Sequence, residues 1–350
     1  MARRTAAVLV AGSWGTALSR VLADNGHQVK LWTRSAEQAD AINRERRNAK
    51  YLPDASLPDA VQATARIADA VSDADAVVFV APSAAMREVA RLAAPHIRPG
   101  ALIVHATKGF EGETLKRMSA VIAEELGVPQ RQVAVLSGPS HAEEVAERHP
   151  TTVVAACEDM ARAEAVQDLF INDSYFRVYT NPDVVGVETA GAIKNIIALG
   201  AGLSDGLGYG DNAKAALITR GLAEIARLGA SMGASPLTFA GLAGVGDLIV
   251  TCTSRHSRNW RAGSMLAQGE KLDEVLRRMG MVVEGVRTTK AARALAAKYR
   301  VEMPITEQLH AVLFEGKPPE QAVGALMGRV RTHEIEEIAA ASREKWLRGT

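Results

Sequence analysis

The segment Val8–Arg34, VLVAGSWGTALSRVLADNGHQVKLWTR, decides the fold of the first half of the chain. It predicts four consecutive elements: a strand over Thr5–Ala11, a tight turn at Gly12–Gly15, a helix over Thr16–Asn25 ended by Gly26, and a strand over Gln28–Thr33. This order is typical of dinucleotide sites, because glycine lets the backbone approach a pyrophosphate and the helix N-terminus offers it free N–H groups. An ordinary strand-to-helix turn with two incidental glycines is the alternative.

One position departs from the dinucleotide fingerprint. The pattern G-x-G-x-x-G would place glycines at positions 10, 12 and 15, and position 10 is Val10. Valine prefers extended backbone and disfavours positive φ. Either the turn forms with Val10 still extended, or cofactor binding is weakened.

Arg34 follows the second strand, where dinucleotide folds that prefer NAD carry Asp or Glu for the ribose hydroxyls. An arginine suits a 2′-phosphate, so this position favours NADPH over NADH. A plain surface arginine is the alternative.

Composition excludes several functional classes. The 350 residues suffice for two domains, and the net charge of +1 provides no field to recruit nucleic acid or anionic lipid. The two cysteines, Cys157 and Cys252, have neither metal-type nor redox-type spacing, so we expect a reducing cytoplasm. No histidine spacing indicates a metal site, and we find no apolar run of the ~20 residues that membrane insertion requires.

Apolar runs predict further buried strands at residues 76–80, 101–106 and 132–136, with a short strand near Val61–Thr64. Helices are expected over Ala36–Arg47, near Ile67–Val71, from Ser83 to about Ala94 and near Glu113–Leu126, and a loop at Tyr51–Asp54. The strands Thr151–Ala156 and Tyr175–Tyr179, with a helix between them, should extend the sheet. Ligands bind beyond the carboxyl ends of such strands, so we expect one crevice to be lined by Gly12–Gly15, Pro82-Ser83, Lys108 and Gly138–Ser140.

The pattern changes at Asn181-Pro182-Asp183, where Asn can cap a helix and Pro suits its first position. From there the pattern predicts helices to the end of the sequence. We therefore predict a Rossmann-like α/β dinucleotide-binding domain over 1–181 and an all-α substrate domain over 182–350. Further expectations are a small-residue helix over Val184–Leu203, a helix Asn212–Met232 capped by Asp211, a loop at Gly241–Asp247, a late helix from Met303, and fraying at Glu344–Thr350.

Two lysines are candidates for chemistry. Lys194 lies in an apolar helix rich in small residues, where desolvation would lower its pKa from ~10.4 and suit it to protonate a carbonyl oxygen. Lys108 stands at a strand end before Gly109 and could hold a phosphate or a substrate oxygen. The alternatives are a lysine that snorkels to solvent and a solvated loop lysine.

The stretch Gly241–Asn259 is dense with reactive groups. Asp247 and Thr251 lie four residues apart and would share a helix face, from which Asp247 could pair with Lys194. Ser257, Arg258 and Asn259 could form a phosphate cradle. A capped helix followed by a polar loop is the alternative.

Together these segments resemble the soluble bacterial NAD(P)-dependent glycerol-3-phosphate dehydrogenases. The matching motifs occur in family order over nearly the whole chain: AGSWGTALS, LWTR, YLPD, ATKG, SGPSHAEEVA, residues 177–229 beginning RVYTNPDVVGVETAGAIKN, GLAGVGDLIVTCTSRHSRN, VVEGVRTT and EMPITE.

The resemblance implies hydride transfer from NAD(P)H to dihydroxyacetone phosphate, giving sn-glycerol 3-phosphate for phospholipid synthesis, in a homodimer without a metal. It implies that Lys194 is the acid/base and that Asp247 belongs to the catalytic set. The implied substrate residues are Lys108, Gly138, Ser140, Lys194, Asn195, Asp247, Thr251, Ser257, Arg258 and Asn259. The implied cofactor residues are Gly12, Ser13, Trp14, Gly15, Arg34, Lys108, Ala142, Arg258, Val282 and Glu284.

Val10 departs from the family pattern, which has glycine there, and this bears on the cofactor site. Two other functions compete with the dehydrogenase: a related two-domain reductase of a hydroxy acid, and a catalytically impaired nucleotide sensor. Lys194 and Asp247 argue against the sensor, which would not need both.

Overall fold

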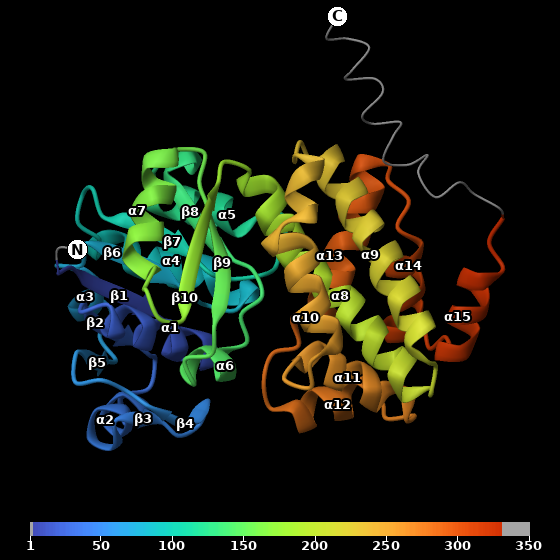
Figure 1. Ribbon diagram of the computed structural model, residues 1–350, viewed down its shortest axis with the longest axis horizontal. Helices are drawn as coiled ribbons and strands as arrows, with labels where there is room; N and C mark the ends of the chain where they lie inside the picture. The colour runs from blue at the N-terminus through green and yellow to red at the C-terminus, as the bar shows by residue number, and fades with distance from the viewer. Residues whose placement is uncertain (1–2, 331–350) are drawn as a thin grey trace, which may run out of the picture. The chain divides into compact units, whose positions relative to one another are not determined.

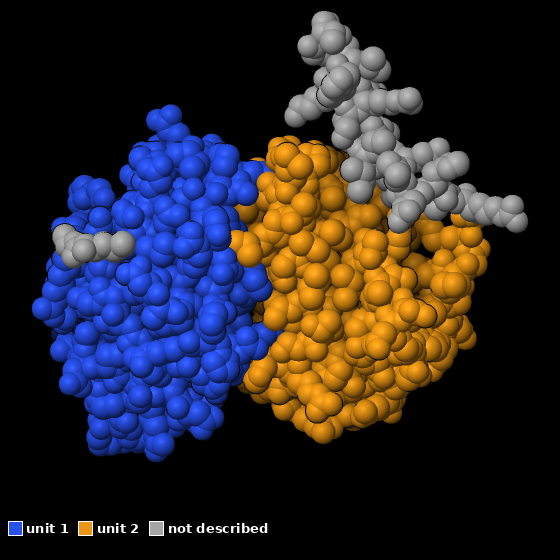
Figure 2. Space-filling view, viewed as in Figure 1, with its two compact units in different colours: residues 1–111, 116–184 blue, residues 112–115, 185–350 orange. Residues whose placement is uncertain are grey.

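The computed structural model describes residues 3–330, and the chain divides into two compact units. The first unit comprises residues 1–111 and 116–184, and the second comprises 112–115 and 185–350 (Figure 2). The first unit has an α/β fold, and every element in the described part of the second unit is a helix. This confirms the predicted fold class.

An eight-stranded sheet organises the first unit (Figure 1), in the order β10-β9-β8-β7-β6-β1-β2-β5. The strands are β1 (Thr5–Leu9), β2 (Gln28–Trp32), β5 (Val61–Thr64), β6 (Ala76–Phe79), β7 (Leu102–His105), β8 (Val133–Ser137), β9 (Thr151–Ala156) and β10 (Phe176–Asn181), with a separate pair β3 (Arg47–Asn48) and β4 (Leu52–Ser56). The helices are α1 (Ser13–Asp24), α2 (Ala36–Glu45), α3 (Ile67–Val71), α4 (Met86–Ala93), α5 (Met118–Leu126), α6 (Ala142–Ala146) and α7 (Met160–Phe170).

Helices cover both faces of this sheet because its strands are apolar on both sides. Alternate residues of β1 enter different cores: Ala6 and Val8 join one buried cluster, and Ala7 and Leu9 join the other. The first cluster includes residues of α1, α2, α6 and α7, and the second includes residues of α3, α4 and α5. Helices on both faces of a mostly parallel sheet are the defining feature of a doubly wound fold.

The turn after β1 differs from the prediction in two ways. Helix α1 begins at Ser13 with Gly12 as its N-cap, so Ser13, Trp14 and Gly15 form its first turn and do not precede the helix. Val10 has a φ of +90°, which excludes the first of the two alternatives, that Val10 stays extended. The N–H groups of Val10 and Ala11 both donate to the Trp32 carbonyl oxygen at 3.0 Å, which fixes this sharp change of direction.

Other departures lie in short local elements between the main strands and helices. Residues 52–54, expected in a loop, belong to β4, which pairs with β3. The helix expected from Glu113 begins only at Met118. The strands β9 and β10 extend the sheet as predicted, with β9 antiparallel to β8. Helix α6 is not predicted by the sequence, and β3 forms where the helix Ala36–Arg47 was expected to end. The other strands and helices of this unit lie where the sequence predicts them, to within a few residues at each end.

The second unit is built around a long helix of small residues. Its helices are α8 (Val184–Gly206), α9 (Asp211–Ser231), α10 (Asp247–Thr253), α11 (Arg258–Ala267), α12 (Leu272–Met279), α13 (Glu284–Tyr299), α14 (Pro304–Phe314) and α15 (Pro319–Met327). A Cβ on Gly202 would lie 1.9 Å from the Trp260 carbonyl oxygen, and one on Gly263 would lie 2.1 Å from that of Leu199. Glycines on both α8 and α11 therefore allow the two backbones to pack closely.

Two local predictions in this unit are wrong. Gly210, and not Asp211, is the N-cap of α9. Residues 242–246, expected in a loop, form one π-helical turn that leads directly into α10. The predicted fraying at Glu344–Thr350 lies outside the described residues.

Helix α8 corrects the expectation that no segment could cross a membrane. Among residues 3–330 it alone is long and apolar enough by length and composition, but 94% of its most apolar window is buried inside the protein. Burial of that kind is typical of a core helix.

Both cysteines are buried, and neither forms a disulfide. Burial raises the pKa of both thiols, that of Cys252 to about 12.

A buried carboxyl group accepts hydrogen bonds from the backbone at the N-terminus of α14. Glu224 is 1% exposed, and its two carboxyl oxygens accept hydrogen bonds from the N–H groups of Ile305 (2.5 Å) and Thr306 (3.2 Å). Burial raises the pKa of Glu224 to about 7, although these hydrogen bonds favour the ionised form.

We predict that ionisation of Glu224 destabilises the second unit as the pH rises. Because the folded-state pKa of about 7 lies above the unfolded value near 4.5, the folded state binds more protons in this window, and stability falls as pH increases through it. The effect amounts to at most about 3 kcal/mol. Glu224→Gln should remove it, as measured by denaturant unfolding at pH 5 and pH 8.

The matched control is Glu302→Gln, which changes an exposed carboxyl group of the same unit. An unaltered pH dependence in Glu224→Gln would contradict the prediction.

Candidate active site

The carboxyl ends of four neighbouring parallel strands, β1, β6, β7 and β8, are followed by the residues that the sequence predicts to line one crevice. β1 pairs with β6, β6 with β7, and β7 with β8, all in parallel. The chain reverses its direction of progress across the sheet between β1 and β6, because β2 and β5 lie on the other side of β1. Such a switch point is where open α/β sheets bind ligands.

The glycines at this edge have distinct roles. A Cβ on Gly15 would lie 2.2 Å from the Val10 carbonyl oxygen, so only glycine lets α1 start this close to β1. No side chain caps α1 at Gly12. Its first N–H groups therefore remain available to an anion such as a pyrophosphate.

Val10 is strained in the position that a glycine would occupy freely. A β-branched residue at positive φ costs about 1–3 kcal/mol and persists only where its surroundings hold it. Besides the two hydrogen bonds to Trp32, the next carbonyl, that of Ala11, accepts from Gln38 Nε2 (3.0 Å) and Asn48 Nδ2 (2.9 Å). Sequence reasoning missed Gln38 and Asn48, because nothing local marks a contact across 27 or 37 residues.

The other predicted cofactor residues of the first unit lie near this turn or at adjacent strand ends. Ser13 Oγ donates to the Tyr51 carbonyl oxygen (2.9 Å), and the Trp14 side chain packs on a buried cluster. Arg34 follows β2 and pairs with Glu88 on α4 at 3.0 Å, with both side chains more than half exposed. Ala142 begins α6 and is buried.

Lys108 and Ser140 meet at one carbonyl group. Lys108 Nζ donates to the Gly138 carbonyl oxygen at 2.9 Å, and Ser140 Oγ donates to the same oxygen at 2.8 Å. Gly138 has a φ of +124°, and a Cβ there would lie 3.1 Å from Val153 Cα. Glycine is thus required at the point that holds both side chains.

In the second unit, Lys194 is 5% exposed and Asp247 is 1% exposed. Lys194 Nζ donates to Asp247 Oδ1 at 2.5 Å and to Thr251 Oγ1 at 2.6 Å. Asp247 and Thr251 share a face of α10, as their spacing predicts, and the Thr251 hydroxyl donates to the Asp247 carbonyl oxygen. A buried ammonium group paired in this way is held in a fixed orientation.

Ser257, Arg258 and Asn259 form the N-terminus of α11. Ser257 is the N-cap and accepts from the Trp260 N–H (3.2 Å). Arg258 donates to the Val282 carbonyl oxygen at 3.0 Å. A helix N-terminus beside an arginine is suited to a phosphate.

A chain of amide groups ties three helices of this unit together. Asn259 Nδ2 donates to Asn195 Oδ1 on α8 (2.9 Å), and Asn259 Oδ1 accepts from the Gly285 N–H on α13 (2.9 Å). The Asn259 side chain is therefore engaged within the protein. Glu284 is the first residue of α13.

Asp205, like Gln38 and Asn48, is a residue with structural contacts that the sequence analysis did not identify. Its carboxylate accepts from Trp260 Nε1 (2.7 Å) and pairs with Lys214 Nζ (2.9 Å), which links α8, α9 and α11. Asp205 and Trp260 lie 55 residues apart, and Lys214 follows Asp205 by nine residues on the next helix, so the fold brings the three together at the first turn of α11.

The residues of the first unit fit a dinucleotide: an uncapped helix N-terminus, close packing through Gly15 and an arginine after β2. Among residues 3–330 no three His, Cys, Asp or Glu side chains are grouped to hold a metal ion.

Comparison with known proteins decides the family. Models of the N-terminal and C-terminal parts of NAD-dependent glycerol-3-phosphate dehydrogenase match residues 5–163 and 183–324. The chain belongs to this dehydrogenase family. The glycerol-3-phosphate dehydrogenase (NAD(P)+) of Bacillus velezensis is 60% identical over 333 residues, 95% of this chain and 96% of that one. The Bacillus subtilis enzyme is 60% identical over 332 residues, with the same coverage.

A solved dehydrogenase of the family shares the fold. The glycerol-3-phosphate dehydrogenase from Coxiella burnetii aligns with a TM-score of 0.89 at 40% identity, covering 93% of this chain and 99% of that one.

We predict that Val10→Gly tightens NADPH binding. Glycine accepts a φ of +90° and removes a half-buried side chain beside the turn. If that side chain crowds the pyrophosphate by ~1–3 kcal/mol, the Kd should fall roughly 5- to 150-fold. Fluorescence titration with NADPH measures the change.

Val10→Ala is the matched control, because it shortens the side chain but retains the strained φ. If the Kd for NADPH is unchanged in both variants, then neither crowding by the Val10 side chain nor its strained backbone affects NADPH binding.

Proposed function

We propose that this chain catalyses the reversible reduction of dihydroxyacetone phosphate to sn-glycerol 3-phosphate with NAD(P)H. The observation that carries the proposal is the buried Lys194–Asp247 pair in a chain of this dehydrogenase family. The cofactor, when bound, supplies the hydride that reaches the ketone carbon. The protein must then provide one proton to the carbonyl oxygen, and it must bind the phosphate.

Lys194 is the proposed proton donor in ketone reduction and the acceptor in the reverse direction. Its ammonium group would protonate the substrate oxygen as negative charge develops there. Asp247 and Thr251 hold Nζ in place and keep the ammonium form compatible with burial. Asn195 is proposed as a supporting polar group next to Lys194.

The N-terminus of α11 is the proposed phosphate site. Arg258 offers a forked guanidinium, and the helix dipole adds partial positive charge in the same first turn. The Ser257 and Asn259 side chains cap or brace that turn. Lys108, Gly138 and Ser140 are proposed to contact the substrate as well.

The uncapped N-terminus of α1 is the proposed pyrophosphate site, and Val282 and Glu284 are proposed as further cofactor contacts. Arg34 favours NADPH, because its guanidinium would meet the 2′-phosphate. Glu88 already pairs with that guanidinium, so NADPH must displace a carboxylate that NADH leaves in place.

The proposed setting is the cytoplasm, where two buried, unpaired thiols are stable, and the product would feed phospholipid synthesis. The family resemblance favours a homodimer, which light scattering would measure.

The first test is the initial rate of NADPH or NADH oxidation with dihydroxyacetone phosphate. Saturable turnover is expected, and Lys194→Met should lower kcat by about 10²- to 10⁴-fold. Cofactor binding should persist in that variant. Lys298→Met, at an exposed lysine of the same unit, is the control. Turnover that survives Lys194→Met would overturn the assigned role.

A second test concerns the phosphate. Arg258→Ala should raise the KM for dihydroxyacetone phosphate by roughly 10- to 150-fold, the equivalent of one charge-assisted hydrogen bond. Its effect on unphosphorylated dihydroxyacetone should be much smaller. Arg255→Ala, an exposed arginine three residues earlier, is the control. Equal losses with both ketones would show that Arg258 does not recognise the phosphate.

A further inference from the structure

The loop between β7 and α5 carries Lys108 and folds back on itself. Phe110 and Arg117 form an antiparallel bridge, and the Glu111 N–H donates to the Lys116 carbonyl oxygen at 3.0 Å. Before this bridge, Thr107 Oγ1 donates to the Ala81 carbonyl oxygen at 2.6 Å. Lys108 thus lies on a short arm that is fixed by Thr107 on one side and by the bridge on the other.

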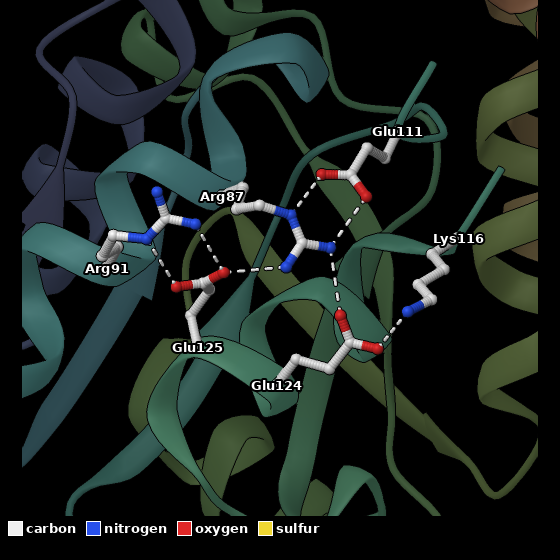
Figure 3. A network of polar contacts seen from close by, with 6 residues as sticks. All are labelled: Arg87, Arg91, Glu111, Lys116, Glu124 and Glu125. Atoms are coloured by element: carbon white, nitrogen blue, oxygen red, sulfur yellow. Dashed lines mark hydrogen bonds and ion pairs between the residues drawn. The ribbon is translucent and has the colours of Figure 1, made fainter. Parts of the chain in front are cut away.

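Arg87, on α4, holds the bridged end of that loop (Figure 3). Its Nε and Nη2 atoms donate to the two carboxylate oxygens of Glu111 at 2.6 and 2.8 Å, a bidentate pair. The same guanidinium donates to Glu125 at 2.8 Å and to Glu124 at 3.0 Å, both on α5. Arg87 therefore connects the loop both to α4, on which it lies, and to α5, which follows the loop.

The surrounding charges make Arg87 the centre of a balanced network. Three cations, Arg87, Arg91 and Lys116, face three carboxylates, Glu111, Glu124 and Glu125 (Figure 3). The Arg87 side chain is 27% exposed and that of Glu111 only 14%, whereas Arg91 is 66% exposed. Bidentate, partly buried pairs fix geometry in a way that exposed pairs do not.

We propose that Arg87 is a positioning residue for substrate binding, acting through Glu111 on Lys108. The inference rests on the proposed function, in which Lys108 contacts the substrate. Lys108 lies three positions before Glu111, a span of at most about 11 Å, so a displaced Glu111 moves the arm that presents Lys108. Lys108 Nζ would then leave the Gly138 carbonyl group, where Ser140 also donates.

The test compares kinetic constants of the full-length enzyme. Arg87→Met should raise the KM for dihydroxyacetone phosphate by about 5- to 10-fold and change kcat by less than about 2-fold, because the proton donor lies elsewhere. Arg87→Lys should restore little, since an ammonium group cannot bind a carboxylate in bidentate fashion. Glu111→Gln, which disturbs the partner alone, should reproduce the KM effect if Arg87→Met folds poorly.

Arg91→Met is the matched control, because it lies one helical turn further along α4 and contacts Glu125 without touching Glu111. Its KM should stay within about 2-fold of the wild type. A similar rise of KM in Arg91→Met would mean that removing any cation of the network weakens substrate binding. That result would overturn the specific role of Arg87.

A double-mutant cycle with Lys108→Ala identifies the route. If Arg87 acts through Lys108, Arg87→Met should add no further KM change in the Lys108→Ala background. An equal, additive change there would overturn the inference alone. A KM unaffected by Lys108→Ala would overturn the proposed role of Lys108 and this inference with it, while turnover would still support the proposed function. A wild-type chain without turnover would overturn the proposed function itself.

Discussion

A lysine ammonium group lies inside the long apolar helix α8, and the second unit is arranged to make that possible. Moving such a charge out of water costs several kcal/mol unless a close partner offsets it. Asp247 and Thr251 provide that partner from one face of α10, which begins directly after a π-helical turn. Both side chains of the pair are buried, and glycines further along α8 let α11 pack at backbone distance.

The first unit differs, because backbone N–H groups at one edge of its sheet must remain available to a ligand. Parallel strands direct their carboxyl ends to the same side, and an uncapped helix begins there. Val10 shows that this edge tolerates strain. Four hydrogen bonds hold a backbone conformation that valine avoids by itself: the N–H groups of Val10 and Ala11 donate to the Trp32 carbonyl oxygen, and the side chains of Gln38 and Asn48 donate to that of Ala11.

The sequence predicted features that depend on neighbours along the chain. Apolar runs marked the sheet strands, and the spacing of Asp247 and Thr251 placed both on one helix face with Lys194 as partner. It failed where the energy comes from distant contacts. The contacts of Asn48, Asp205 and Arg87 each depend on residues brought together only by the completed fold. The positive φ of Val10 belongs to the same class, because its own side chain argues against it. The β3–β4 pair and the late start of α5 at Met118 differ, because their pairings join residues only four to nine positions apart and no apolar run marks them.

Both native thiols lie in the interior with raised pKa values, so at neutral pH neither provides much of the nucleophilic thiolate. Thiol-directed reagents will therefore find few targets on the folded chain. A single cysteine introduced at an exposed position would be the one that reacts. The chain is thus ready for site-specific attachment of a fluorophore or spin label without removal of its own cysteines, and distances between labelled pairs could follow motion during turnover.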